Sequence, residues 1–240
     1  MEESIRAESS ALFRARAVTA RIAAAATRVG RDPCEVRLLA ATKNRTVQEI
    51  QEVVATGAVW GLGENRVQEA CLKIDLLGEM PFPGIGWHMI GRLQTNKVGL
   101  LAGKVQMIHS VDRLRLVEAI ARSCPDIPVL IQVSLAGEQE KGGVLPAEVE
   151  LLCRTALERG LAVRGFMTMP PKGGEKIARP VFRELRELRD RCAAALGVAL
   201  PELSMGMSRD MECAVEEGST IVRVGKDLFA PSSEDLQITG

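Results

Sequence analysis

The chain has 240 residues, of which 46% are hydrophobic and 26% charged, and its 31 basic residues balance its 31 acidic ones. A domain of this length can be a single α/β barrel, and the composition is that of an ordinary folded domain. The balanced charge argues against a nucleic-acid partner or an anionic membrane surface, and no apolar run approaches the length of a membrane span.

The N-terminus and the cysteines indicate the compartment. Residues 1–6 include two acidic residues and an arginine, and no apolar core of signal-peptide length follows them. Six scattered cysteines form no Cys-x-x-Cys pair; they are Cys34, Cys71, Cys124, Cys153, Cys192 and Cys213. We therefore predict free thiols in a cytoplasmic protein. His88 and His109 stand apart from other potential ligands, so no zinc site is expected.

The chain opens with an Ala- and Arg-rich segment whose apolar residues recur at helical spacing over residues 5–29. This pattern predicts one long leading helix within residues 1–30. Short apolar or β-branched runs then alternate with amphipathic stretches. The predicted strands are 36–41, 58–62, 87–90, 106–109, 129–134, 163–167, 202–207 and 220–224.

Eight strands separated by helices predict an α/β fold of the closed parallel (β/α)8 type, the TIM barrel. We expect it to be a single domain spanning residues 1–240, with residues 231–240 as a tail. An open doubly wound sheet is the alternative. One helix start is legible after the first strand, where Thr46 and Glu49 have the spacing of a capping box.

Chemistry in such a barrel lies at the carboxyl ends of the strands. Several polar or small residues fall at or just after predicted strand ends: Lys43, residues 63–65, His88, Ser208 and Gly225. Their common placement predicts one site at this end of the barrel.

Lys43 ends an apolar run, residues 38–41. A lysine amine forms a Schiff base only when it is unprotonated, which burial or a nearby cation favours. The apolar run is expected to remove the amine from water, and Arg45 or Arg223 could supply the cation. The alternative is a solvated lysine that marks the end of a strand.

The loops after the last two strands suit a phosphate group, because barrels often bind phosphate there through backbone amides. Ser208 offers a hydroxyl at a helix start, or else is an N-cap, and Gly225 lets the backbone approach an anion. Arg223 lies within the last strand and needs a partner. That partner is either a pyridine nitrogen or a carboxylate such as Glu64.

Three further polar positions are ambiguous on sequence alone. Asn65 could donate to the phenolic oxygen of a pyridoxal ring, or cap the helix that contains Val67. His88 is more often a core histidine than a catalyst. Lys97, in the polar stretch 94–97, is a candidate for a second ligand site.

Taken together, these stretches resemble the pyridoxal phosphate homeostasis proteins. The resembling residues are 39–43, 63–69, 87–97, 203–212 and 218–225, so the similarity spans nearly the whole chain. The resemblance implies a fold-type III barrel, like the N-terminal domain of the alanine racemases, without their second, β-rich domain.

The resemblance also implies a cofactor site for pyridoxal 5′-phosphate (PLP). Lys43 would carry the cofactor as a Schiff base, Ser208 and Gly225 would hold its phosphate, and Arg223 would face its ring nitrogen. Asn65 would lie near the ring, and the predicted contacts also include His88 and Met205. Lys226 departs from the pattern, because such proteins often have a small hydroxyl residue there, which puts the outer phosphate contact in doubt.

The function implied is intracellular PLP homeostasis by a monomer that buffers the cofactor or delivers it to apo-enzymes. Two alternatives stay open: a PLP-dependent amino-acid racemase, and a barrel enzyme for a phosphorylated sugar or acid. A two-base racemase of this fold usually takes its second acid from a tyrosine, and this chain has none. We therefore expect a carrier and not an enzyme.

Overall fold

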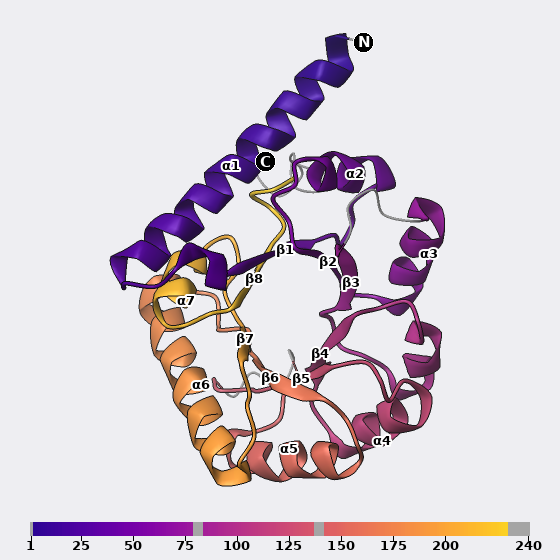
Figure 1. Cartoon of the computed structure of the whole chain (residues 1–240), viewed down its shortest axis with the longest axis vertical. Coiled ribbons are helices and arrows are strands. Elements are labelled where there is room, and N and C mark those ends of the chain that lie inside the picture. The colour runs from indigo at the N-terminus through magenta and orange to yellow at the C-terminus, as the bar shows by residue number, and fades with distance from the viewer. Residues whose placement is uncertain (1, 79–83, 137–141, 230–240) are drawn as a thin grey trace.

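The computed structural model describes residues 2–78, 84–136 and 142–229, with the backbone alone for residues 2–9, so the predicted tail 231–240 lies outside it. Eight parallel strands form a closed barrel in sequence order (Figure 1). They are β1 (Arg37–Ala41), β2 (Gly61–Glu64), β3 (Gly86–Met89), β4 (Met107–Val111), β5 (Val129–Gln132), β6 (Val163–Met167), β7 (Glu202–Ser204) and β8 (Ile221–Val224). The closed barrel is confirmed and the open sheet is wrong, since Leu39 of β1 lies opposite both Gly61 and Arg223.

Helices surround the barrel (Figure 1). The α-helices are α1 (Glu2–Arg28), α2 (Val47–Ala55), α3 (Val67–Leu77), α4 (Leu114–Ser123), α5 (Val149–Glu158), α6 (Glu175–Leu196) and α7 (Met211–Glu216). Shorter 3-10 helices are η1 (Pro33–Glu35), η2 (Thr95–Leu101), which follows β3, and η4 (Pro146–Glu148). The capping box at the start of α2 is confirmed, with Thr46 and Glu49 bonded reciprocally.

The second strand lies further along the chain than the predicted 58–62, at Gly61–Glu64. Apolar periodicity could not detect a strand whose inward positions are glycines. The glycines are needed because neighbouring side chains fill the interior. A Cβ on Gly61 would lie 2.9 Å from His88 Nε2, and one on Gly63 would lie 2.8 Å from Ile90 Cδ1.

The leading helix is confirmed and has a structural role that its position in sequence did not reveal. Helix α1 packs against both α7 and α2, and Figure 1 shows it running beside α7. Its buried face consists of small and branched residues, Ala15, Val18, Ile22, Ala25 and Ala26. No helix follows β8 within the described residues, so α1 covers the barrel wall at β8 and β1.

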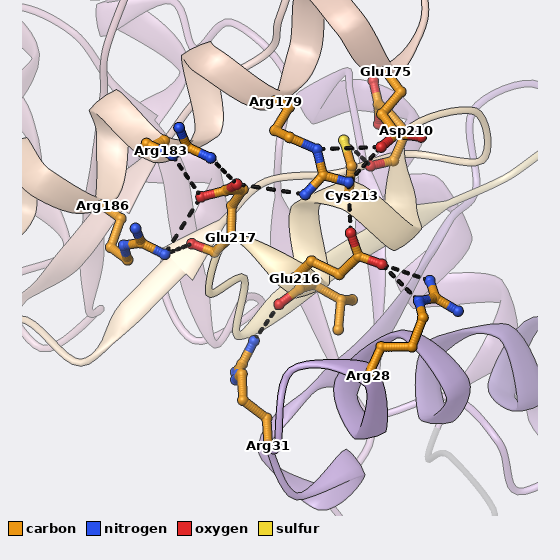
Figure 2. Close-up of polar contacts among 11 residues, drawn as sticks. Arg28, Arg31, Glu175, Arg179, Arg183, Arg186, Asp210, Cys213, Glu216 and Glu217 are labelled. Atoms are coloured by element: carbon orange, nitrogen blue, oxygen red, sulfur yellow. Dashed lines mark hydrogen bonds and ion pairs between the residues drawn. The ribbon is translucent and has the colours of Figure 1, made fainter.

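Ion pairs tie α6 and α1 to the end of α7 (Figure 2). Glu216 pairs with Arg28 of α1 at 2.6 Å and with Arg179 of α6 at 2.5 Å. The neighbouring Glu217, whose side chain is 6% exposed, pairs with Arg179 and with Arg183 at 2.9 Å. Arg186 is a third partner of Glu217, at 3.4 Å. A nearly buried carboxylate held by three arginines is firmly fixed, so this network holds the segment between β7 and β8 in place.

All six cysteines are free thiols, as predicted. Within the part of the chain that the structure describes, no helix is both long and apolar enough to cross a membrane.

Candidate functional site

Four of the predicted site residues meet at the carboxyl end of the barrel. Lys43 follows β1 by two residues, Asn65 directly follows β2, and Gly225 directly follows β8. Because β1 pairs with both β2 and β8, these three residues come from neighbouring strands. Ser208 lies in the turn between β7 and α7, the strand and helix before β8.

Lys43 itself is exposed, whereas Leu38, Leu39 and Ala40 of the apolar run before it are buried and Ala41 is partly buried. The expectation that this run removes the Lys43 amine from water is therefore wrong. The apolar run forms most of β1, and Lys43 lies two residues beyond the end of that strand.

A buried polar network holds the residues next to Lys43 and Asn65. Lys73 of α3 donates from Nζ to Glu64 Oε2 at 2.6 Å and to the Thr42 carbonyl at 2.7 Å. Thr42 Oγ1 donates to Glu64 Oε2 at 2.8 Å, and the Asn65 N–H donates to Glu64 Oε1 at 2.7 Å. One fully buried carboxylate thus fixes the backbone just before Lys43 and at Asn65.

Sequence reasoning missed this network, although one signal was available. Lys73 continues the i, i+3 spacing of Val67 and Ala70, which are the other buried residues of α3. A lysine on the buried face of a helix needs an anionic or carbonyl partner nearby.

Arg223 is buried, but the hypothesis that it pairs with Glu64 is wrong. It donates to the Ser204 carbonyl at 2.6 Å, to Ser204 Oγ at 2.7 Å and to the Thr168 carbonyl at 2.9 Å. Burial lowers the pKa of Arg223 to about 10, and the Asp210 carboxylate acts against that shift. The guanidinium therefore stays charged near neutral pH, at the carboxyl ends of β6 and β7.

A chain of side chains crosses the barrel interior from Arg223. Ser204 Oγ lies 2.9 Å from His109 Nδ1, and His109 Nε2 lies 3.1 Å from His88 Nδ1. Arg223 can only donate, so the Ser204 hydroxyl hydrogen is free to donate onward to His109 Nδ1. With the hydroxyl in this orientation both histidines carry their proton on Nε2, and among Arg223, Ser204, His109 and His88 only His88 Nε2 lacks a hydrogen-bond partner.

His88 does not face the carboxyl end of the barrel, which corrects the prediction that it contacts a cofactor. Its Nε2 points toward Gly61, at the start of β2, and its ring lies 4.6 Å from that of Trp60. Burial and the charge of Arg37 lower the pKa of His88 to about 3. The ring is therefore neutral near pH 7, and its interpretation as a core histidine is confirmed.

This histidine predicts a pH-dependent stability. Its pKa is about 3 when folded but returns to about 6.5 when unfolded, so the unfolded chain binds protons more readily between these values. The contribution of His88 to the free energy of unfolding is fully present above pH 6.5 and decreases as the pH falls toward 3. At pH 5 it has decreased by about 2 kcal/mol. Urea unfolding measures the free energy of unfolding at pH 7.5 and at pH 5. Between these two values His88→Gln should lose about 2 kcal/mol less of it than wild type does. Equal losses would contradict the assignment.

The loops after β7 and β8 are built for close backbone approach. Gly206 has φ +93°, and a Cβ there would lie 2.5 Å from the Ala214 Cβ. A Cβ on Gly225 would lie 3.1 Å from the Ala41 carbonyl oxygen. Ser208 is not an N-cap, since Asp210 holds that position before α7. The Ser208 hydroxyl is thus not used for capping.

Comparison with known proteins places the chain in a family. A model described as "Alanine racemase, N-terminal domain" matches residues 14–233. The pyridoxal phosphate homeostasis protein of Aquifex aeolicus is 46% identical over 219 residues, covering 88% of this chain and 94% of that protein. The Escherichia coli protein of the same name is 36% identical over 219 residues, covering 87% and 91%.

This chain belongs to the pyridoxal phosphate homeostasis protein family. PipY of Synechococcus elongatus, solved with PLP bound, is 33% identical with a TM-score of 0.76, covering 89% of this chain and 100% of that one. A viral arginine decarboxylase from Paramecium bursaria Chlorella virus shares only the fold, at 15% identity and a TM-score of 0.66.

In this homeostasis-family chain, Met205 offers no group to the carboxyl end of the barrel. Its side chain is fully buried in the core between strands and helices. Its N–H donates to the Ile221 carbonyl at 3.1 Å, and its carbonyl accepts from Ser219 Oγ at 2.7 Å. Met205 therefore shapes the start of the loop after β7 instead of lining its surface.

Asn65 is exposed and does not cap the helix it precedes. Arg66 holds the N-cap position of α3, so the capping interpretation of Asn65 is wrong. Its side chain thus stays available at the end of β2. Lys226, beside Gly225, is also exposed.

Proposed function

We propose that this chain binds PLP at the carboxyl end of the barrel, holds it covalently and reversibly through Lys43, and buffers it or delivers it to apo-enzymes in the cytoplasm. The observation that carries the proposal is the meeting of Lys43, Gly225 and the Arg223 guanidinium at one end of the barrel. PipY, which is 33% identical, supports it as a relative with PLP bound.

The residues at this end fit the parts of the cofactor. Bound PLP would supply an aldehyde, the group with which a primary amine forms a Schiff base. Lys43 is the amine, and its exposure lets the linkage reverse in water. Gly225 and Ser208 take the phosphate, because the Ser208 hydroxyl is not used for capping and glycine lets the backbone approach an anion closely. Lys226 supplies an outer ammonium, and Asn65 donates to the phenolic oxygen.

Arg223 favours binding of the cofactor over catalysis with it. A guanidinium that donates to the ring nitrogen cannot give up its proton at neutral pH, so that nitrogen stays unprotonated. Ser204 and Thr168 fix the guanidinium through three hydrogen bonds, which leaves it little freedom to turn away. An unprotonated ring is a weak electron sink, and the chain lacks a tyrosine for two-base racemisation.

The test is the visible absorption spectrum of the purified wild-type monomer with added PLP, before and after borohydride. We expect a visible band that collapses on reduction and leaves a reduced adduct on the Lys43 peptide. A protein that stays colourless and binds sugar phosphates instead would favour the phosphorylated-substrate barrel. Delivery requires that the loaded protein activate an apo-enzyme faster than free PLP does.

Helix α1 positions the phosphate loops. Arg21 donates to the Ser208 carbonyl at 3.0 Å and pairs with Glu212 and Asp227, each at 2.6 Å. Through this hydrogen bond and these ion pairs, one side chain bridges the loops after β7 and β8. Sequence periodicity places Arg21 on the helix but gives no indication of this contact.

Arg21→Ala is expected to weaken PLP affinity about tenfold, because both phosphate loops lose their common anchor. Covalent labelling of Lys43 at saturating PLP should persist. The matched control is Arg28→Ala, two turns along the same helix, where Arg28 pairs with Glu216 at 2.6 Å but reaches neither Ser208 nor Asp227. Equal weakening in the two variants, measured by PLP titration, would reduce Arg21 to a general helix contact.

A further inference from the structure

A second cavity lies beside the proposed cofactor site and is lined by cations. Its volume is about 610 Å³, and it is bounded by the start of α3, the loop after β3, η2 and the residue before α4. The lining residues are Asn65, Arg66, Val67, Gln68, Arg92, Leu93, Gln94, Lys97 and Arg113. Four are cationic, three are amides and none is a carboxylate.

Two of the four cations have no ion-pair or hydrogen-bond partner for their side chains among the described residues: Arg92, which is exposed, and Lys97, which is partly buried. The other two are paired outside the cavity. Arg66 contacts Glu69 at 3.1 Å, and Arg113 contacts Asp112 at 2.5 Å. The cavity therefore carries two uncompensated positive charges from residues 92 and 97.

The helix starts at this cavity add to the positive field. Arg66 is the N-cap of α3 and Arg113 the N-cap of α4, and neither side chain caps its helix. N-cap positions favour Ser, Thr, Asp or Asn, and a cation there opposes the helix dipole. Both arginines line the same cavity. An anion bound in that cavity would offset their unfavourable interaction with the two helix N-termini.

We propose that this cavity binds a phosphate dianion, as inorganic phosphate or as the phosphate of a small monoester. Arg92 and Lys97 supply the two charges that match a dianion, since the second pKa of a phosphate monoester is about 6. Gln68, Gln94 and Asn65 supply neutral donors around it. The site does not depend on Lys43, and only Asn65 is shared with the proposed cofactor site.

The test is a calorimetric titration of inorganic phosphate, and in parallel of ribose 5-phosphate, at pH 7.5 and low ionic strength. Each titration is run on the protein without PLP and on protein whose Lys43-bound PLP has been fixed with borohydride and freed of excess PLP; the fixed PLP fills the site at Ser208 and Gly225 if that proposal holds. We expect one saturable site in both conditions, weakened by salt. If ribose 5-phosphate binds more tightly than inorganic phosphate, the ligand is a monoester. If the two bind equally, the cavity recognises only the phosphate group.

Arg92→Gln combined with Lys97→Gln is expected to weaken phosphate affinity by more than about tenfold. Both residues lie at the surface, so folding should persist, with an unchanged melting temperature as the check. The matched control is Arg122→Gln combined with Arg164→Gln, two exposed arginines outside the cavity that lower the net charge equally.

Three results would overturn the proposal. The first is the absence of saturable phosphate binding in the wild type. The second is an equal loss of affinity in the control pair, which would mean that only the overall charge matters. The third is phosphate binding that PLP abolishes and the Arg92 and Lys97 double variant retains, which would place the anion at Ser208 and Gly225.

Discussion

Lys73→Met is expected to lower the free energy of unfolding by about 3–5 kcal/mol, because it strands a charged carboxylate in the barrel wall. Glu64 is fully buried, and Lys73 is its cationic partner at 2.6 Å. The Thr42 carbonyl also loses the donor that Lys73 supplies at 2.7 Å. Urea unfolding followed by circular dichroism at pH 7.5 measures the loss.

A surface pair of the same length provides the control. Lys104 contacts Asp75 at 2.6 Å, but the two side chains are 33% and 64% exposed. Solvent screens such a pair, so Lys104→Met should cost less than about 1 kcal/mol. Adding Glu64→Gln to Lys73→Met removes the stranded charge and should restore part of the lost stability. Equal losses in the free energy of unfolding for Lys73→Met and Lys104→Met would show that the buried pair stabilises the fold no more than a surface pair does.

Lys43→Ala is expected to abolish covalent attachment of PLP while leaving the fold intact. The side chain is exposed, and among the described residues no hydrogen bond or ion pair joins it to the buried network that holds Thr42. Its removal should change unfolding stability by no more than about 0.5 kcal/mol. The visible band should disappear, and borohydride should leave no adduct on the protein. The phosphate and ring contacts would then hold PLP without the covalent bond, and more weakly.

Two variants separate chemistry from charge at this position. Lys43→Arg keeps the positive charge but lacks a primary amine, so it should lose covalent labelling as completely as Lys43→Ala. Lys226→Ala removes the nearest lysine after Gly225 and should retain the labelling. A reduced adduct on Lys226 or on another lysine in wild type would assign the anchor elsewhere.

The sequence itself determined the fold and the family. Apolar runs alternating with helical patterns specify a parallel barrel because the runs form strands from local preferences, without reference to their partners. The second strand, Gly61–Glu64, is the exception, since its inward positions are glycines. Strand ends are local as well, so Lys43, Asn65 and Gly225 could be assigned to one end of the barrel before any contact was known. The free state of the cysteines followed from their spacing in the same way.

The tertiary structure decided which polar groups meet. Glu64 and Lys73 lie on a strand and a helix, and Arg21 is more than 180 residues from the loops it bridges. On sequence alone Glu64 was one of two possible partners of Arg223, but the Ser204 carbonyl of β7 and the Thr168 carbonyl just after β6 accept from Arg223 instead. His88 lies in the interior beside His109, where Gly61 of β2 leaves room for its ring. Such choices depend on which side chains fill a shared interior, and only the closed barrel defines that interior.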